Sequence, residues 1–165
     1  MSNIRTRIAR IGDRDFIISL VPRLTEFELP SWREAKQMNS ADEKAISRTL
    51  ELDPPEATIL IAEDEDASPL GFIHLNVATD YFTYETYGHI SDVVVSHDGE
   101  GRGVGRALMS AAETWAKGLG FRWLTLNVFA ENARAIGLYE KLEYEKETIK
   151  YLKVLNGSED EITAS

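Results

Sequence analysis

One glycine-rich segment has the residue types that bind an anion through the protein backbone, and it reads Gly99-Glu100-Gly101-Arg102-Gly103-Val104-Gly105-Arg106. Glycine allows positive φ angles and a close approach of a ligand to the chain. An apolar run, Val93–Val95, precedes the segment, and an apolar helical stripe follows it. A strand, a glycine loop and a helix start can aim several N–H groups and the positive end of the helix dipole at one anion. The segment therefore predicts a phosphate site.

The pattern of apolar residues predicts the elements that would position this loop. Strands are expected at 4–10, 58–62, 70–78, 87–96, 123–128 and 149–155. Helices are expected at 17–27, with a break at Pro22, at 40–53, at 104–119 and from Asn132 to Leu142. The start of the second helix is placed at Ser40-Ala41-Asp42-Glu43, which has capping-box spacing. This order predicts one α/β domain over residues 1–155 with a mixed sheet, followed by a polar, disordered tail at 156–165.

Composition excludes several function classes. The 165 residues suffice for one domain with a real core, and they include no cysteine, which excludes disulfides, thiolate catalysis and cysteine-ligated metal. No apolar run approaches a membrane span, and the start lacks a signal-peptide core, so we expect a cytoplasmic protein. The net charge of −10 is opposite to that of a nucleic-acid binder. Three lone histidines at these spacings, His74, His89 and His97, suggest no metal site.

The charge is unevenly distributed along the chain. Residues 26–66 contain twelve acidic and four basic residues, whereas residues 100–141 contain four acidic and six basic residues. An anionic ligand would therefore meet the least repulsive surface beside the glycine loop.

Two common phosphate motifs fit the loop poorly. A nucleotide P-loop requires Lys-Ser or Lys-Thr after its glycines, and neither occurs here. A dinucleotide fingerprint requires Gly-x-Gly-x-x-Gly in an opening βαβ unit, whereas these glycines have a strict period of two and come late in the chain.

The sequence resembles a known family more closely. The segment from Asp92 to Leu108, which contains the glycines, resembles the acetyl-CoA loop of the GNAT superfamily of N-acetyltransferases. The resemblance continues through 124–129 and through Asn132 to Leu142. It implies a GNAT-like fold, with a mixed, mostly antiparallel central sheet of about six to seven strands and about four helices on both faces. Two splayed strands of that sheet would form a wedge for acetyl-CoA.

The resemblance also implies which residues hold the acetyl donor. Backbone N–H groups of the loop would bind the pyrophosphate of CoA, namely those of Gly101, Arg102, Gly103, Val104, Gly105 and Arg106. The backbone at Val93 and Val95 would pair with the pantetheine arm, on a strand that carries a bulge. A free N–H near Val94 would steady the thioester oxygen. Asn132 would cap its helix and reach the pantetheine or phosphate arm.

For catalysis, the resemblance implies direct transfer of the acetyl group from the CoA thioester to a primary amine. Tyr139 stands at the position of the acid that protonates the thiolate, although a core-facing aromatic remains an open alternative. His89 falls where some members place the base, and a strand histidine held by a neighbour is the alternative. Asp92 and Glu85 are fallback bases acting through water, whereas His74 and His97 have weaker claims.

This sequence departs from the family pattern at two places. Glu100 replaces the usual Gln or Arg, and a carboxylate beside a pyrophosphate costs energy unless it turns away or pairs with Arg102 or Arg106. Glu143 replaces a glycine that supports a left-handed helix cap, so we expect that helix end to be remodelled, with Tyr144 still filling an aromatic slot.

The acceptor is expected to bind between the first two helices and the hairpin at 80–88. This half combines many carboxylates with six aromatic residues, Phe27, Trp32, Tyr81, Phe82, Tyr84 and Tyr87, which suits a cationic amine. A polyamine, an amino sugar, an amino acid and a protein amine all remain open, as does a homodimer. The alternative functions are a non-catalytic CoA-binding or sensor module and a binding domain for another phosphate ligand such as a nucleotide.

Overall fold

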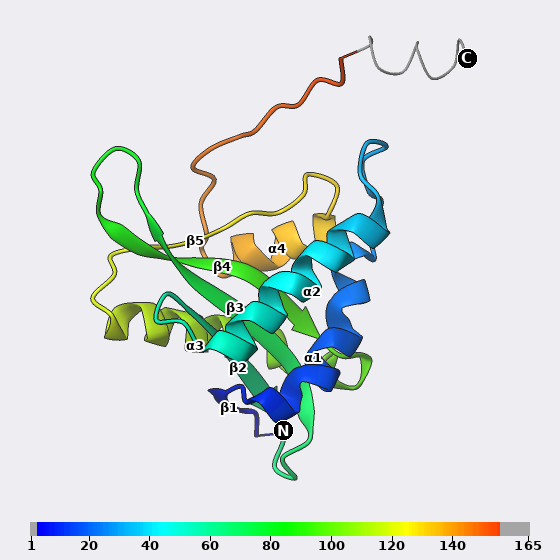
Figure 1. Cartoon of the computed structure of the whole chain (residues 1–165), viewed down its shortest axis with the longest axis vertical. Coiled ribbons are helices and arrows are strands. Elements are labelled where there is room, and N and C mark those ends of the chain that lie inside the picture. Colours follow the sequence, from blue (N-terminus) through cyan, green and yellow to red (C-terminus); the bar gives the residue numbers. More distant parts are fainter. Residues whose placement is uncertain (1–2, 156–165) are drawn as a thin grey trace.

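The structure, a computed structural model, describes residues 3–155 as an α/β sandwich built on one five-stranded sheet. Figure 1 shows the sheet between two layers of helices. The strands are β1 (Arg5–Ile8), β2 (Ala57–Glu63), β3 (Pro69–Thr79), β4 (Thr86–Val95) and β5 (Leu124–Leu126). The α-helices are α1 (Arg14–Leu20), α2 (Ala35–Leu52), α3 (Val104–Gly118) and α4 (Ala133–Lys141). Three short 3-10 turns, η1 (Ile11–Asp13), η2 (Val21–Thr25) and η3 (His97–Gly99), join these elements.

The sheet is mixed and mostly antiparallel, as predicted. Its strands follow the order β1-β2-β3-β4-β5; the first four are antiparallel neighbours, and β5 runs parallel to β4. The described residues form five strands, fewer than the six to seven expected, because the strand predicted at 149–155 does not join the sheet. That segment is extended, and Ile149, Tyr151, Leu152 and Leu155 are exposed. Apolar composition favours a strand, but a strand forms only where a partner edge is in reach.

Each face of the sheet carries its own core, because alternate strand residues point to opposite faces. On one face, Ile59, Ile61, Phe72 and Val94 pack against α1, η2 and α2. On the other face, Ile73, Leu75 and Ile90 pack against Val104 and Leu108 of α3. Figure 1 shows α2 crossing one face of the sheet while α3 lies behind the opposite face. Any side chain on β3 or β4 is thereby assigned to one of the two faces.

The helix boundaries confirm one prediction and correct another. The first helix does break at Pro22, where α1 gives way to the 3-10 turn η2. The second helix does not begin at Ser40; α2 begins at Ala35, so the predicted capping box lies inside the helix. Residues 35–38 are good helix formers and extend the helix toward the N-terminus. The helix ends as expected, at Asp53 with φ of 43° and directly before Pro54.

Within residues 3–155, no helix combines the length and the apolar character needed to cross a bilayer. The polar tail predicted at 156–165 lies outside the described residues.

Candidate functional site

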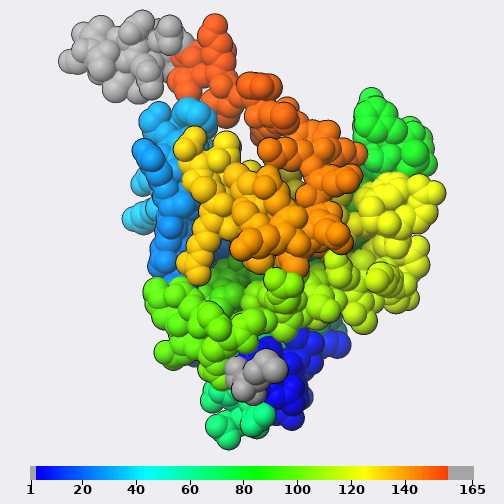
Figure 2. Space-filling view, turned by 180° about the vertical axis from the view of Figure 1, so that it is seen from behind, coloured from blue at the N-terminus to red at the C-terminus, as the bar shows by residue number. Residues whose placement is uncertain are grey.

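The glycine loop forms an open cradle at the start of α3. Gly103 caps the helix with φ of 79°, Gly101 has φ of 71°, and no side chain caps this helix end. A Cβ atom at either glycine would meet no atom within 4 Å, so the space in front of the loop is empty. The first N–H groups of a helix have no partner inside it. The N–H of Arg102, which was also predicted as a donor, instead donates to the carbonyl of Gly99 at 3.3 Å. The start of α3 still presents backbone donors to an open space, as an anion site requires. Figure 2 shows this region, in light green, directly below α4, in orange.

The carboxylate of Glu100 is paired with a cation, but not with either of the residues expected. Its carboxylate accepts a hydrogen bond from the Nη2 of Arg23, a residue of η2, rather than from Arg102 or Arg106. This bond is the main reason that the pKa of Glu100 lies below its usual value. Arg102 instead lies 3.6 Å from Asp64, in the turn between β2 and β3. The negative charge that Glu100 brings to the loop is thus neutralised by Arg23, which lies 77 positions away in the chain.

β4 carries the expected bulge and then separates from β5. His74 pairs with Asp92 while the next residue, Leu75, pairs with Ile90, so Ser91 is the extra residue. β5 pairs only with Gly88, His89 and Ile90. Among the described residues, β4 beyond the bulge therefore has no strand partner on its β5 side. This leaves the wedge that the extended arm of a cofactor would fill.

The backbone after the bulge has a defined orientation. The N–H of Ser96 donates to the carbonyl of Leu70 on β3, and antiparallel strands alternate the direction of these groups. The backbone groups of Val94 therefore point to β3, and those of Val93 and Val95 point to the open side. The carbonyl of Val95 already accepts from Nε of Arg23 at 2.7 Å. The free N–H expected near Val94 would accordingly come from Val93 or Val95.

α4 carries Tyr139 and packs it against the core on the α3 face of the sheet. Its N-cap is Asn132, as predicted, whose Oδ1 accepts from the N–H of Ala135. We expected the C-terminal end of α4 to be remodelled, and it is not. Glu143 adopts φ of 67°, and the N–H of Tyr144 donates to the carbonyl of Tyr139. A glutamate therefore occupies a left-handed position that glycine would fill without strain. Tyr144 packs beside Tyr139 against the α3 core, which is the aromatic slot predicted for it.

Three predicted catalytic residues lie around β4. Tyr139 is half-buried, and burial followed by the charge of Asp92 raises the pKa of its hydroxyl. Burial lowers the pKa of His89, and Asp92 opposes part of that shift. The Nδ1 of His89 lies 2.7 Å from the Oγ1 of Thr125 on β5. At neutral pH this combination gives a protonated phenol and a neutral imidazole within electrostatic range of one carboxylate, the states that an acid and a base require.

Two other candidates lie elsewhere. Glu85 is in the hairpin between β3 and β4 and pairs with Nε of Arg122 at 3.2 Å. His97 is exposed in η3, beside Arg23 and Glu100. Neither lines a cavity of the structure that contains Asp92.

A cavity of about 340 Å³ was not predicted from the sequence. It opens between α2 and the bulged part of the sheet, with Asp42, Arg48 and Thr49 on the helix side and His74, Asn76, Ser91 and Asp92 on the strand side. His74 is 2% exposed, its Nε2 lies 2.8 Å from the Oγ1 of Thr49, and its buried Nδ1 has no hydrogen-bond partner. Asp42 and Thr49 share a helix face through the i, i+7 spacing. In the sequence, Asp42 was named only as part of the Ser40–Glu43 capping motif, and its helical spacing to Thr49 is the signal that could have placed it here.

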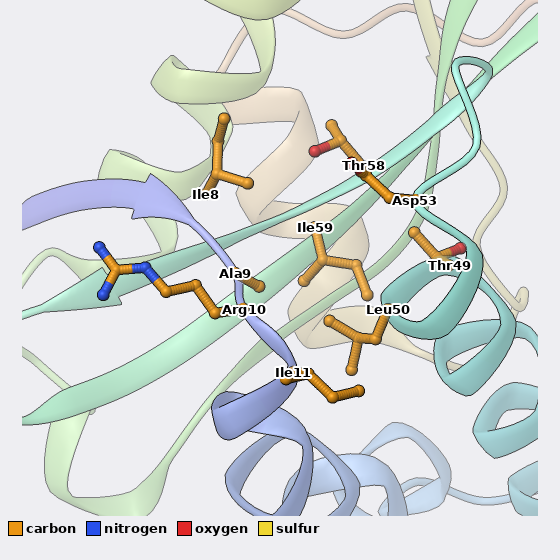
Figure 3. Close-up of a pocket in the computed structure, with 9 residues that line it drawn as sticks. All are labelled: Ile8, Ala9, Arg10, Ile11, Thr49, Leu50, Asp53, Thr58 and Ile59. Atoms are coloured by element: carbon orange, nitrogen blue, oxygen red, sulfur yellow. The ribbon is translucent and has the colours of Figure 1, made fainter.

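A second cavity, of about 220 Å³, lies at the C-terminal end of α2 (Figure 3). Thr49 and Leu50 approach Ile59 and Ala9 there, while the side chain of Arg10 points away. Its lining mixes apolar and polar residues, and its two charged members, Arg10 and Asp53, are exposed. We find no cluster of reactive groups in it.

The six aromatic residues expected around the acceptor are not gathered at either cavity. Tyr81, Phe82 and Tyr84 are exposed at the hairpin, and Tyr87 stacks near Trp123. The ring of Phe27 lies 5.4 Å from that of Phe129, beyond β5. Within the described residues, no group of three or more His, Asp or Glu side chains is arranged to hold a metal ion.

Comparison with known proteins identifies the family. Residues 21–144 match the model of the acetyltransferase (GNAT) family. An uncharacterized N-acetyltransferase of Bacillus subtilis is 30% identical over 142 residues, which are 86% of this chain and 90% of that protein. A putative acetyl transferase from Pyrococcus furiosus has the same fold, with a TM-score of 0.72 and 22% identity over 93% of this chain and all of the other. An aminoglycoside N-acetyltransferase in complex with CoA superposes with a TM-score of 0.68 and 19% identity over 93% and 96% of the two chains. The chain belongs to the GNAT family of acetyltransferases and is an acyltransferase enzyme.

Proposed function

We propose that this acetyltransferase uses acetyl-CoA to acetylate a primary amine by direct attack. The observation that carries the proposal is the open cradle at the N-terminus of α3 beside a wedge between β4 and β5. A pyrophosphate fits the cradle, with the N–H groups of Gly101, Gly103, Val104 and Gly105 as its donors, aided by Arg102 and Arg106. Coenzyme A bound there would extend its pantetheine arm along Val93, Val94 and Val95, past Asn132, toward Tyr139.

The chain's own residues then move the protons. His89 takes one proton from the protonated amine, whose nitrogen attacks the thioester carbonyl carbon, so that a C–N bond forms and the C–S bond breaks. Tyr139 gives its phenolic proton to the departing sulfur and regains one from the nitrogen. The products are the acetamide, free CoA thiol and one proton left on His89. The carboxylate of Asp92 stabilises the imidazolium form of His89 until His89 releases this proton.

The neutral states of both groups support these roles. Burial keeps the hydroxyl of Tyr139 protonated, and it keeps the imidazole of His89 unprotonated at neutral pH. An acid that holds its proton and a base that has lost its own are both ready at the same pH.

A test separates this function from the alternative of a non-catalytic CoA sensor. In the proposed enzyme, Tyr139→Phe lowers kcat by about 100-fold or more and leaves the Kd for acetyl-CoA unchanged. Thermal shift with acetyl-CoA, CoA, ATP and NAD checks the ligand class, and stabilisation by CoA compounds alone is expected. Stabilisation by ATP or NAD without CoA would overturn the proposal.

The proposal includes a homodimer. The extended segment after α4 carries Ile149, Tyr151, Leu152 and Leu155 as exposed side chains. Figure 1 shows that segment leaving the body of the molecule near β5 and α4. Apolar side chains in this number favour burial against a second copy. Light scattering on the whole chain, and on a chain ending at residue 148, is expected to give a dimer and a monomer respectively.

A further inference from the structure

The cavity between α2 and the sheet contains two carboxylates for which the described structure shows no hydrogen bond. In the described structure Asp42 makes no hydrogen bond or ion pair, although it is half-buried. Asp92 faces it from β4, and its Oδ2 lies 3.6 Å from the Nδ1 of His74, too far for a hydrogen bond. Two carboxylates facing one small space repel each other and are stabilised by a cation between them.

The buried imidazole is a second and independent sign of a ligand. His74 is 2% exposed, and its Nδ1 is a buried polar atom without a hydrogen-bond partner. Such atoms are rare in native proteins, and each calls for a partner. Nδ1 faces Asp92 at the wall of the same cavity, so a group bound there completes the polar contacts of this cluster.

Among residues 3–155, no cationic side chain fills this role. Arg48 lines the cavity, but its guanidinium lies 3.7 Å from Glu56 and its side chain is largely exposed. The other polar lining groups, Asn76 and Ser91, are hydrogen-bonded to each other. The cavity therefore offers net negative charge, with space for one small positively charged group.

The cavity also adjoins the proposed reaction centre. Asn76 of the cavity wall pairs in register with His89, so the two side chains emerge on the same face of the sheet. Asp92 belongs to the cavity wall and shifts the pKa of both His89 and Tyr139. A cation between Asp42 and Asp92 is thus beside the groups that would exchange its protons.

We propose that the cavity between Asp42 and Asp92 binds the acceptor amine as an alkylammonium ion. The imidazole of His74, whose Nδ1 lies 3.6 Å from Asp92, forms part of the cavity wall. This inference rests on the proposed function and names its acceptor class. The volume of about 340 Å³ admits an aminoalkyl arm rather than a whole oligosaccharide. Arylamines, which are neutral at pH 7, gain nothing from the two carboxylates. The acceptor is therefore a flexible chain with a terminal alkylammonium, such as a lysine side chain or an alkyl diamine.

The electrostatic state of Asp42 is consistent with this role. Burial and the charge of Asp92 raise the pKa of Asp42 to about 6, and His74 opposes the shift. An empty cavity therefore holds a carboxylate that is poorly stabilised, and an ammonium ion relieves that cost.

The kinetic test compares Asp42→Asn with Glu43→Gln, a matched loss of charge on the next residue of α2, which does not line the cavity. Asp42→Asn is expected to raise the KM for an alkylamine acceptor at least about tenfold, with the Kd for acetyl-CoA unchanged, and Glu43→Gln is expected to leave both unchanged. Equal KM values in the two variants would overturn the inference, as would an arylamine that is acetylated as efficiently as an alkylamine.

A binding test that needs no turnover keeps the inference separate from the proposed function. The imidazole signals of His74 are followed by NMR in the wild-type chain as 1,4-diaminobutane or the neutral 1,4-butanediol is added. The diamine is expected to shift the signals of buried His74, the diol is expected to leave them unchanged, and Asp42→Asn is expected to abolish the shift. An unchanged His74 with the diamine overturns the cavity site. Shifted signals without acetyl transfer to any amine uphold the cavity and overturn the proposed function.

Discussion

The Nη2 of Arg23 donates to the carboxylate of Glu100, and the Nε of the same guanidinium donates to the carbonyl of Val95. One side chain from η2 thereby joins the glycine loop to the end of β4. The bond to Glu100 removes an uncompensated negative charge from the entrance of the cradle. A loop with a glutamate at this position can then bind the pyrophosphate that the proposed function requires.

Loss of Arg23 is expected to weaken the binding of acetyl-CoA. In Arg23→Gln the freed carboxylate of Glu100 repels the phosphates, so the Kd for acetyl-CoA is expected to rise several-fold. Glu100→Gln alone is expected to bind at least as tightly as the wild type. The double variant is expected to bind like Glu100→Gln, which isothermal calorimetry measures as a coupling. A double variant as weak as Arg23→Gln would contradict this relation.

The strained end of α4 is expected to be a site of easy stabilisation. Glu143 has φ of 67°, so Glu143→Gly relieves about 1 kcal/mol of backbone strain. Glu140→Gly, in the last turn of α4, is expected instead to lower the stability, by up to about 1 kcal/mol. Urea unfolding curves measure both free energies. A Glu143→Gly variant less stable than the wild type would show that the glutamate side chain outweighs the strain.

Stability near neutral pH is expected to increase when Asp42 is replaced. The pKa of this carboxyl is raised from 3.8 to about 6 in the folded chain. The protonated carboxyl therefore favours the folded state at pH values below the pKa of the unfolded chain, and this contribution to the free energy of unfolding is lost as the pH rises through about 6. We compare the gain in stability of Asp42→Asn over the wild type at two pH values. With allowance for solvent screening, this gain is expected to be larger at about pH 8 than at about pH 4 by about 1 kcal/mol in the free energy of unfolding, or about 2–4 °C in Tm. Thermal melts at both pH values test it. A difference of the opposite sign would mean that Asp42 is well solvated.

His89 is expected to set the acid limb of kcat. Burial lowers its pKa below 6.5, so kcat at saturating acceptor should hold down to that pH and fall once the imidazole is protonated. His89→Gln is expected to lower kcat by about 100-fold and to remove this limb. Asp42 does not contribute to the acid limb of kcat at saturating acceptor, because the bound ammonium keeps its carboxylate charged. An acid limb that persists in His89→Gln would assign the base to Asp92 acting through water.

The elements with a clear local pattern were predictable from the sequence. The alternation of apolar and polar residues at 4–10 predicts a strand, and the apolar stripe of α3 predicts a helix, without knowledge of the partners of either element. The strand at 149–155 was wrong because pairing is decided by a partner edge, which a local pattern does not contain. The start of α2 was wrong because helix-forming residues before Ser40 outweighed a capping motif.

The candidate site was only partly predictable for the same reason. The glycine loop and Tyr139 lie in a continuous motif, whereas Arg23 and Glu100 meet across 77 positions. The opposition of His74 and Asp92 depends on a bulge that shifts the register at Ser91. Asp42 joins them only because α2 packs its Asp42–Thr49 face over that part of the sheet. Each of these contacts is set by tertiary structure.

The central claim is that this chain moves an acetyl group from acetyl-CoA to an amine. The most direct measurement incubates the chain with acetyl-CoA and a panel of alkyl diamines, lysine peptides, amino sugars and amino acids, and quantifies released thiol together with the acetylated product by mass spectrometry. The account predicts equal amounts of thiol and acetamide, saturation with an alkylammonium acceptor, and loss of both products in Tyr139→Phe. Tight binding of CoA with no acetylated product from any amine would contradict it.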